Sequence, residues 1–341
     1  MIHVCYGLYD KDGKYSKFVG TSITSIFENT SADVTVHILH DNTLTVDNRD
    51  KFVYVAGRYN QQVKFYNVEE SCKQEITNLK HMFPKESLER FSIGTAFRLF
   101  APKIIANNID KIIYLDCDVI VNLDIKEMWQ IELDNKPLAA VLEWEDSRIS
   151  QQGLQICRDG LVKGEDYFNA GVIIINLSRW RTDNSQMQKK LTFITNNPKY
   201  HLFDQDFLNY CFSTQYLKLP SKFNCWVRRE RSSGVNTIQR KVYHFIGQGD
   251  SLGLNMQDNF HRLYFEYFTK TPWFNIDMLD NIANSFIQTA NKNKTDLLQL
   301  TKALSGKVRA FFTEPQNSEA IKQIFAVNPN EELITPPLHA C

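Results

Sequence analysis

Hydrophobic and polar positions alternate along the first hundred residues in a way that predicts strands and helices in turn. Short apolar runs that are typical of strands occupy residues 2–8, 34–40 and 63–68. Helical patterns lie between them at residues 16–30 and 48–59. Strands that alternate with helices are typical of βαβ units and indicate a parallel sheet.

The alternation continues to about residue 273 and predicts one large α/β domain. Further apolar runs predict strands at residues 111–121, 138–144, 170–176 and 240–247. Helices are expected at residues 92–100, 186–197, 204–212 and 256–273. Pro102 should end or kink the first of these helices, because proline lacks the backbone N–H that a helix interior needs.

Two aspartates, Asp116 and Asp118, interrupt the apolar run at residues 112–121. Residues i and i+2 of a strand share a face, so the two carboxylates project together at the C-terminal end of a strand, where open α/β sheets bind ligands. Neighbouring carboxylates repel each other unless a positive charge lies between them, and their hard oxygens suit Mg²⁺ or Mn²⁺. The structural alternative is that Asp118 caps the strand end while Asp116 accepts hydrogen bonds from backbone amides.

Composition and charge exclude several classes of protein. The 341 residues include 23 Phe, 14 Tyr and 5 Trp, which is too aromatic for a disordered chain. Lys+Arg and Asp+Glu number 39 each, so the basic excess of a nucleic-acid-binding protein is missing and no nucleic-acid partner is expected. Seven cysteines without a CxxC pair argue against a disulfide framework or a zinc ribbon. The N-terminus lacks the pattern of a signal peptide, and the expected location is cytoplasmic.

The composition changes at about residue 281, where the sequence becomes helix-like and rich in polar residues. A main domain at residues 1–280 and a small helical C-terminal add-on at residues 281–341 are therefore predicted. Within the add-on, residues 290–312 combine lysines with leucines. They fit either a helix packed on the main domain with its lysines in water, or a basic amphipathic face in peripheral contact with the inner face of the membrane.

Several ordered motifs together resemble the family 8 glycosyltransferases, which are retaining enzymes with a GT-A fold. They are Arg98 in TAFRLF, YLDCDV at 114–119, YFNAGVIIINLSRWR at 167–181, FDQDFLN at 203–209, KFN at 222–224 and HFIG at 244–247. The resemblance runs from Ile2 to about Trp273. It implies a Rossmann-like mixed sheet flanked by helices, as in the glycogenins and the bacterial galactosyl- and glucosyltransferases of cell-surface glycans.

The resemblance implies a cofactor and a donor site. Asp116, Asp118 and His244 would hold Mn²⁺ or Mg²⁺, which would act as a Lewis acid towards the UDP leaving group. Gly247 would let the backbone approach the phosphates closely. The residues expected to bind the UDP-sugar donor are Tyr6, Gly7, Asp10, Arg98, Asp116, Cys117, Asp118, Glu143, Asn169 and Gly247.

Asp204 and Gln205 match the positions expected to act in catalysis. An amide such as Gln205 is a poor nucleophile, so front-face attack within a tight ion pair is favoured over a covalent glycosyl-enzyme. Asp204 would orient or electrostatically support the oxocarbenium-like sugar. The role of Glu143 stays open. It is either a carboxylate near the donor sugar or the acceptor, or an ordinary exposed acid after a strand.

Two departures from the family pattern stand out. The segment after the first strand, CYGLYDKDG, is longer than usual, so Asp10 and Asp12 are both candidates for the acid that holds the uridine. Asp250 stands where the family often has a lysine that contacts the diphosphate, and an aspartate cannot make that contact. The replacement charge could come from the arginines at 227–234, although that cluster also fits a solvated loop.

The predicted function is transfer of a hexose, Gal or Glc, from a UDP-sugar to a glycan or glycoprotein acceptor with retention. Candidate residues for stacking on sugar faces are Trp144, Tyr167, Trp180 and Trp226. One alternative is a haloacid-dehalogenase-type phosphatase with Asp116 as the nucleophile. Another is a catalytically weak protein that binds a nucleotide-sugar or a glycan.

Overall fold

A computed structural model describes residues 1–82, 92–200, 202–247 and 258–275 of the chain. The predicted helical add-on at 281–341, with its basic stretch at 290–312, lies outside these described residues, and so does Asp250.

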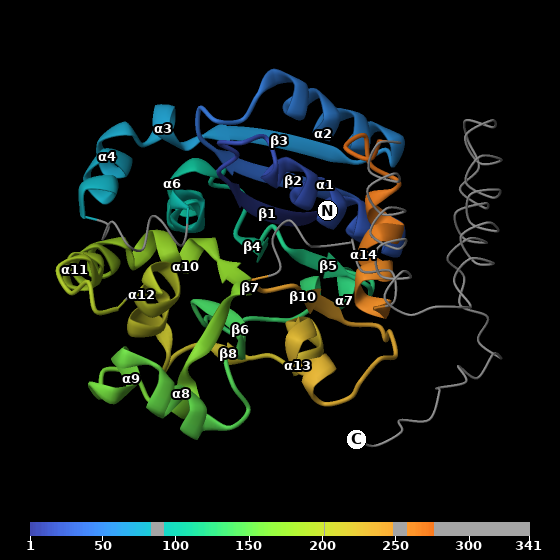
Figure 1. Cartoon of the computed structure of the whole chain (residues 1–341). Helices are drawn as coiled ribbons and strands as arrows, with labels where there is room; N and C mark the ends of the chain where they lie inside the picture. The colour runs from blue at the N-terminus through green and yellow to red at the C-terminus, as the bar shows by residue number, and fades with distance from the viewer. Residues whose placement is uncertain (83–91, 201, 248–257, 276–341) are drawn as a thin grey trace, which may run out of the picture.

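A seven-stranded mixed sheet runs through the centre of the described residues (Figure 1). Its order is β3-β2-β1-β4-β7-β6-β8. The strands are β1 (Ile2–Leu8), β2 (Val34–His40), β3 (Gln62–Asn67), β4 (Lys111–Leu115), β6 (Leu138–Leu142), β7 (Phe168–Asn176) and β8 (Leu217–Lys218). All neighbours pair in parallel except β7, which runs antiparallel to both β4 and β6. The parallel sheet expected from the alternation is thus correct for β1 to β4 and wrong at β7.

A second sheet has three short strands in the order β5-β10-β9. They are β5 (Val119–Val121), β9 (Cys225–Trp226) and β10 (Val242–His244). Strand β10 pairs antiparallel with β5 and parallel with β9. The single strand predicted at 111–121 is therefore two strands in different sheets, and Asp116–Asp118 form the link between them.

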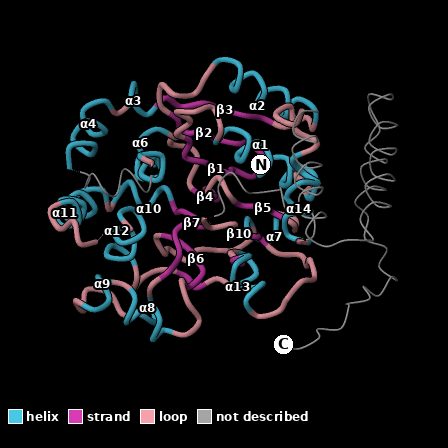
Figure 2. Tube along the Cα trace, viewed as in Figure 1, coloured by secondary structure: helices cyan, strands magenta, loops and turns pink. Residues whose placement is uncertain are grey.

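Helices flank the sheets, as the colouring in Figure 2 shows. The first part of the chain forms α1 (Tyr15–Asn29), α2 (Val46–Arg58), α3 (Val68–Ser71), α4 (Lys73–Met82), the 3-10 helix η1 (Ile93–Phe100) and α6 (Ala101–Ile104). The middle forms α7 (Lys126–Trp129), α8 (Ser147–Gly153), α9 (Gln155–Arg158), η2 (Gly164–Asp166), α10 (Leu177–Thr182) and α11 (Asn184–Thr195). The last part forms α12 (Phe203–Phe212), η3 (Ser221–Phe223), α13 (Val227–Ser232) and α14 (Asn259–Phe268).

Two predicted helices differ in detail from the structure. Residues 93–100 form a 3-10 helix, and Pro102 lies in the first turn of the following α6, where its missing N–H leaves no hydrogen bond unmade. The predicted helix 256–273 ends at Phe268. Trp273 lies beyond it, packs its ring against Gly20 of α1 and donates its indole N–H to Asn48 at 2.8 Å.

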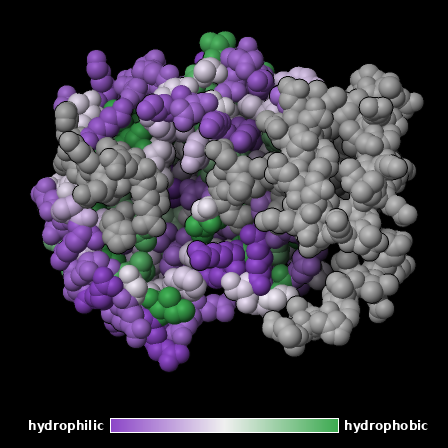
Figure 3. All heavy atoms as spheres, viewed as in Figure 1, coloured by the Kyte–Doolittle hydropathy of each residue, from purple (hydrophilic) through white to green (hydrophobic). Residues whose placement is uncertain are grey.

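The large sheet is buried on both faces. Along β1, Val4 and Tyr6 belong to a core formed with α1, α2 and α14, whereas Cys5 belongs to a core formed with α3, α4, η1 and α10 to α12. This alternation follows from the two-residue period of a strand. On the face drawn in Figure 3, most of the described surface is hydrophilic. Within the described residues, no helix has both the length and the apolar character needed to span a membrane.

A chain of hydrogen bonds links β1, β2 and β3 on one face of the sheet. His3 Nδ1 lies 3.0 Å from His37 Nε2, and His37 Nδ1 lies 3.0 Å from the hydroxyl of Tyr66. Burial lowers the pKa of His37 to about 3, and the positive charges of His3 and Lys64 act in the same direction. His37 is therefore neutral in the folded protein at pH 7.

We expect His37 to make the protein sensitive to acid. Its pKa in the unfolded chain is about 6.5, so below that pH the unfolded chain binds a proton that the folded chain does not. The free energy of unfolding should then fall by up to about 1.4 kcal/mol per pH unit from this residue alone. His37→Gln cannot titrate, so urea unfolding between about pH 7 and pH 5 should show a weaker pH dependence than in the wild type.

Thr35→Val is the matched control, because Thr35 is buried on the same strand and carries no titratable group. It should change the stability equally at each pH. If His37→Gln keeps the full pH dependence of the wild type, His37 takes up its proton without unfolding and the expectation is wrong.

Candidate functional site

A cavity of about 480 Å³ opens at one edge of the large sheet. β1, β4 and β6 end at this edge and the reversed β7 begins there, so Gly7, Asp116, Glu143 and Asn169 all line the cavity. This is the carboxyl edge of the parallel strands, where α/β sheets bind ligands. A second cavity of about 800 Å³ lies among α4, α6, α10 and α11. Trp180, a candidate for sugar stacking, lines it, but none of the residues predicted for the donor, the metal or catalysis does.

Strand pairing brings His244 to the two aspartates. Asp116 and Asp118 flank Cys117 in the link between β4 and β5, and β10 lies beside β5 with His244 opposite Val119. His244 Nε2 is 3.2 Å from Asp118 Oδ1 and 3.9 Å from Asp116 Oδ2. One nitrogen or oxygen atom from each of the three lies within 4.8 Å of the others. Two carboxylates and an imidazole are a donor set that suits Mn²⁺ or Mg²⁺.

The electrostatics of this trio favour a positive charge among its members. Burial by itself would raise the pKa of Asp118, but His244 outweighs it and the pKa is lowered. Burial likewise opposes protonation of His244, yet Asp118, with a smaller contribution from Asp116, raises its pKa. A proton or a metal cation at Nε2 would relieve the repulsion between the two carboxylates.

Gly171 on β7 lets the trio come together. Its backbone oxygen accepts the N–H of Asp116 at 2.7 Å. A Cβ at this position would collide with the ring of His244 and lie 2.7 Å from Asp116 Oδ2. Only glycine leaves room for both side chains. The sequence pattern does not mark Gly171, because the need for a glycine there arises from contacts with His244 and Asp116, which belong to other segments.

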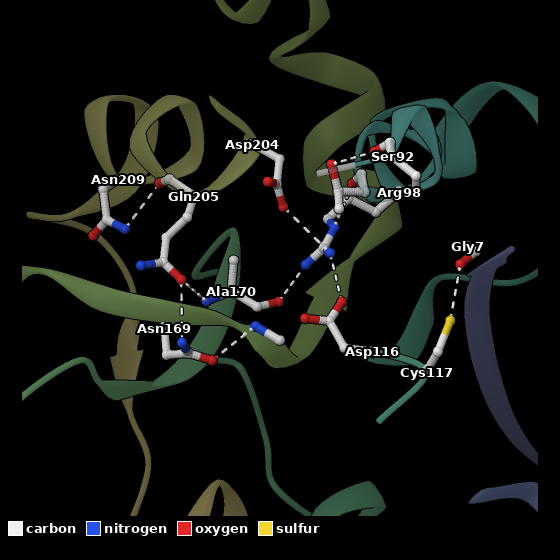
Figure 4. A network of polar contacts seen from close by, with 12 residues as sticks. Gly7, Ser92, Arg98, Asp116, Cys117, Asn169, Ala170, Asp204, Gln205 and Asn209 are labelled. Carbon is white, nitrogen blue, oxygen red and sulfur yellow. Dashed lines mark hydrogen bonds and ion pairs between the residues drawn. The ribbon is translucent and has the colours of Figure 1, made fainter. Parts of the chain in front are cut away.

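Arg98 projects from η1 and is engaged by protein groups on every side (Figure 4). Its Nη2 lies 2.6 Å from Asp116 Oδ1 and 3.2 Å from Asp204 Oδ2, and its Nη1 donates to the backbone oxygen of Ala170. The guanidinium also lies 4.1 Å from the ring centre of Tyr114. Arg98 therefore positions two carboxylates of the cavity and is itself almost fully buried.

A second set of hydrogen bonds joins Glu143, Asn169 and Gln205. Glu143 Oε2 accepts from Asn169 Nδ2 at 3.0 Å and from Gln205 Nε2 at 3.1 Å. Gln205 Oε1 accepts from Asn169 Nδ2 at 3.2 Å and from the backbone N–H of Ala170 at 3.0 Å (Figure 4). Glu143 is only 6% exposed, so the expectation of an ordinary exposed acid is wrong.

Burial also shifts the pKa values of the acids in the cavity. It raises the pKa of Glu143, although hydrogen bonds from Asn169 and the charge of Arg229 oppose it. It raises the pKa of Asp204 to about 6, with Arg98 opposing and Asp116 adding to the effect. Both carboxyls are thus more readily protonated than in water, as expected where acids lie close together in a shielded site.

Tyr6 and Asp10, predicted to bind the donor, do not line the cavity. The side chain of Tyr6 is fully buried and its hydroxyl lies 2.8 Å from that of Ser22. The Asp10 carboxylate accepts the backbone N–H groups of Tyr15 at 2.7 Å and Ser16 at 3.2 Å, which begin α1. Both predictions are corrected for the same reason: packing against α1 uses these side chains.

Other predicted residues do reach the cavity. Cys117 lines it and donates its thiol to the backbone oxygen of Gly7 at 3.4 Å. Burial and the two flanking carboxylates raise the pKa of this thiol well above its usual value. Gly247 also lines it, with a φ of 74° that a side chain would strain. Three aromatic residues that the sequence did not indicate also line the cavity: Tyr9, Tyr15 and Phe18. Tyr9 directly follows β1, and the other two lie in the first turn of α1.

The arginine cluster does not line the cavity. The guanidinium of Arg229 lies 3.7 Å from the ring centre of Trp144 and 3.4 Å from that of Trp226, and it donates to the backbone oxygen of Glu143. Arg231 pairs with Asp258 at 2.6 Å. Of the four aromatic residues considered for sugar stacking, Tyr167 and Trp180 are buried, Trp144 packs on Arg229, and Trp226 lines the cavity.

Comparison with known proteins identifies relatives of the chain. Residues 8–249 match the model of glycosyl transferase family 8. A putative glycosyltransferase of Haemophilus influenzae is 31% identical over 220 residues, which cover 64% of this chain and 62% of that protein. The lipopolysaccharide 1,3-galactosyltransferase of Salmonella typhimurium is 23% identical over 91% of this chain and 90% of its own length. The chain thus spans less than two thirds of the first of these relatives.

Solved structures share the fold. The galactosyltransferase LgtC, solved in complex with donor and acceptor sugar analogues, superposes with a TM-score of 0.63 at 21% identity, covering 82% of this chain and 99% of LgtC. The bifunctional glycosyltransferase WbbM superposes with a TM-score of 0.62 over 80% of this chain and 50% of WbbM, at 19% identity. The predicted GT-A fold, a mixed sheet flanked by helices, is confirmed.

Gly171→Ala should destabilise the protein, because the added Cβ overlaps the His244 ring and Asp116. Overpacking of this kind costs about 1–3 kcal/mol, which urea unfolding would measure. Gly57→Ala is the control, since Gly57 lies in α2 with open space around its Cβ position and should gain about 0.4–1 kcal/mol. Equal stability of Gly171→Ala and the wild type would contradict the close approach.

Asp10→Ala should lower the free energy of unfolding by about 0.5–2 kcal/mol, the usual effect of removing a carboxylate that caps a helix. Asp12 is exposed, and Asp12→Ala should change stability by no more than about 0.5 kcal/mol. Thermal and urea unfolding of both variants would check the difference. Two equally stable variants would mean that the carboxylate of Asp10 does not support α1.

Proposed function

The chain belongs to glycosyl transferase family 8, and from that premise we propose that it moves a hexose from a UDP-sugar to a glycan or glycoconjugate acceptor with retention. The observation that carries the proposal is the convergence of Asp116, Asp118 and His244 within 4.8 Å in one cavity. The haloacid-dehalogenase alternative loses its basis, because membership of this family accounts for the same Asp-x-Asp pattern.

The order of the strands gives the cavity three regions that suit the parts of a UDP-sugar. Aromatic side chains lie near the end of β1 and the start of α1, where Tyr9 and Tyr15 would pack on a nucleobase. Asp116, Asp118 and His244 lie next, beyond the end of β4, where a diphosphate would need a cation. Glu143, Asn169 and Gln205 follow near β6 and β7, and amides and carboxylates of this kind bind sugar hydroxyls.

The charge of the cavity supports a divalent cation. In the part of the chain that the structure describes, four carboxylates line it, those of Asp116, Asp118, Glu143 and Asp204. The guanidinium of Arg98 is already paired with Asp116 and Asp204. A diphosphate would therefore meet little positive charge from the described residues that line the cavity. Asp116, Asp118 and His244 would hold Mn²⁺ or Mg²⁺ here, and the cation would supply Lewis-acid stabilisation of the UDP leaving group.

The catalytic residues would act mainly by orientation. The Gln205 carboxamide is held by Glu143 and by the backbone of Ala170, and an amide is a poor nucleophile. We therefore favour front-face transfer: the bond from C1 to the phosphate oxygen breaks, the acceptor oxygen bonds to C1 on the same face, and the phosphate takes the acceptor proton. Asp204, paired with Arg98, would support the positive charge on the sugar.

The named relatives guide the proposal for substrates. One is a lipopolysaccharide 1,3-galactosyltransferase of Salmonella typhimurium and another a lipopolysaccharide 1,2-glucosyltransferase of Escherichia coli, the latter 26% identical over 65% of this chain and 62% of its own length. We propose Gal or Glc as the hexose and a surface glycan as the acceptor. Action in the cytoplasm, with peripheral membrane contact through residues 290–312, stays a prediction.

Donor hydrolysis tests the proposal. The protein would be incubated with UDP-Glc, UDP-Gal or UDP-GlcNAc, with Mn²⁺ or with EDTA, and free UDP would be measured. We expect release from UDP-Glc or UDP-Gal, which EDTA and Asp118→Ala should both reduce to background. Asp50→Ala, which removes an exposed carboxylate of α2 that does not line the cavity, is the matched control and should release UDP as the wild type does.

Each other outcome would contradict a different part of the proposal. UDP that binds in calorimetry but is never released from a donor, even with candidate acceptors present, would indicate a nucleotide-sugar-binding protein. A chain that does not bind UDP at all would contradict the proposed donor. Release that persists in EDTA would contradict the cation.

A further inference from the structure

Asn224 lies immediately before β9, between two functional groups of the cavity. It is 3% exposed and is not among the residues that line the cavity. Its Nδ2 lies 2.7 Å from Asn169 Oδ1, and its Oδ1 lies 2.9 Å from His244 Nδ1. One buried carboxamide therefore contacts both the metal-ligand candidate His244 and the sugar-side residue Asn169.

The backbone of β7 determines which way this carboxamide faces. The N–H of Gly171 donates to Asn169 at 2.9 Å, so the atom of Asn169 that it contacts must be the oxygen. The atom of Asn224 that lies against that same oxygen must then be the NH2 group, which leaves the oxygen of Asn224 facing His244. A backbone donor, which cannot change its role, fixes the orientation of both amides.

The orientation of Asn224 in turn selects the tautomer of His244. An amide oxygen only accepts hydrogen bonds, so Nδ1 of His244 must carry the hydrogen. The neutral ring then presents the lone pair of Nε2 to Asp118 at 3.2 Å and Asp116 at 3.9 Å. This is the arrangement that a metal ligand requires, and residues that orient a ligating histidine normally contribute to metal affinity.

Asn169 extends this chain of hydrogen bonds to the other side of the cavity. Its Nδ2 donates to Glu143 Oε2 at 3.0 Å and to Gln205 Oε1 at 3.2 Å. Loss of the hydrogen bond from Asn224 would leave one acceptor site of Asn169 Oδ1 without its buried partner. The chain of contacts runs from His244 through Asn224 and Asn169 to Gln205.

We propose that Asn224 is a positioning residue that couples the cation site to the sugar-binding amides. It acts on the cation by fixing the tautomer of His244 and on the sugar side by fixing the carboxamide of Asn169. The proposal rests on the proposed function, since it gives His244 the role of a metal ligand.

Two substitutions of Asn224 separate its two hydrogen bonds. Asn224→Ala removes both, so we expect Mn²⁺ to bind about 10- to 100-fold more weakly in calorimetry without any nucleotide. Asn224→Asp keeps an oxygen for His244 but cannot donate to Asn169. It should therefore retain Mn²⁺ affinity within about threefold of the wild type while UDP release from the donor falls by about 10-fold or more.

Asn122→Ala is the control, because Asn122 also makes two amide hydrogen bonds, to Gln239 and Tyr267, but does not line the cavity. It should leave the Mn²⁺ affinity unchanged, and the thermal midpoint of every variant would be compared. Asn224→Asp binding Mn²⁺ as weakly as Asn224→Ala would overturn selection of the tautomer. Unchanged UDP release by Asn224→Asp would overturn the coupling to Asn169.

The same experiment distinguishes this proposal from the proposed function. If the wild type binds Mn²⁺ and Asp118→Ala does not, but Asn224→Ala binds it normally, only the role of Asn224 is overturned. If the wild type does not bind Mn²⁺, the cation site and the role of Asn224 are overturned together.

Discussion

The candidate site depends on the backbone at the start of β7. There the N–H and C=O of Ala170 bind Gln205 and Arg98, while the N–H and C=O of Gly171 bind Asn169 and Asp116. These groups belong to a strand paired on both sides, so they can neither rotate nor exchange donor for acceptor. The side chains of Arg98, Asn169 and Gln205 and the backbone of Asp116 take their positions from them. A polar network anchored in this way is rigid, as the proposed sugar-binding site would need.

The charges of the site follow from the same arrangement. Buried carboxylates are unfavourable unless positive charge or hydrogen bonds stabilise them. Arg98 stabilises Asp116 and Asp204, and two amides stabilise Glu143. Asp116 and Asp118 both lie near His244, and a proton or a cation between these groups would relieve the repulsion of the two carboxylates. A cation at this position would thus offset the charge that packing brings together as well as that of any phosphate in the cavity.

Arg229 shows how a charged residue can serve the site without lining it. Its guanidinium packs against the rings of Trp144 and Trp226, and burial lowers its pKa to about 10. Its hydrogen bond to the backbone of Glu143 fixes the segment that follows β6. The cluster at 227–234 therefore supports one wall of the cavity, and among the described residues it does not replace the lysine that the family often places near the diphosphate.

The sequence by itself determined the local features: the alternation of strands and helices, the buried strands, and the Asp-x-Asp pattern at a strand end. It could do so because the hydrophobic period is a local property of the chain. Tertiary structure decided the reversed direction of β7, the burial of Glu143 and the use of Tyr6 and Asp10 in packing α1. It also brought Gly171 and Asn224 into contact with the residues of the site. Each of these depends on contacts between different strands and helices, and the hydrophobic pattern of a single segment does not show such contacts.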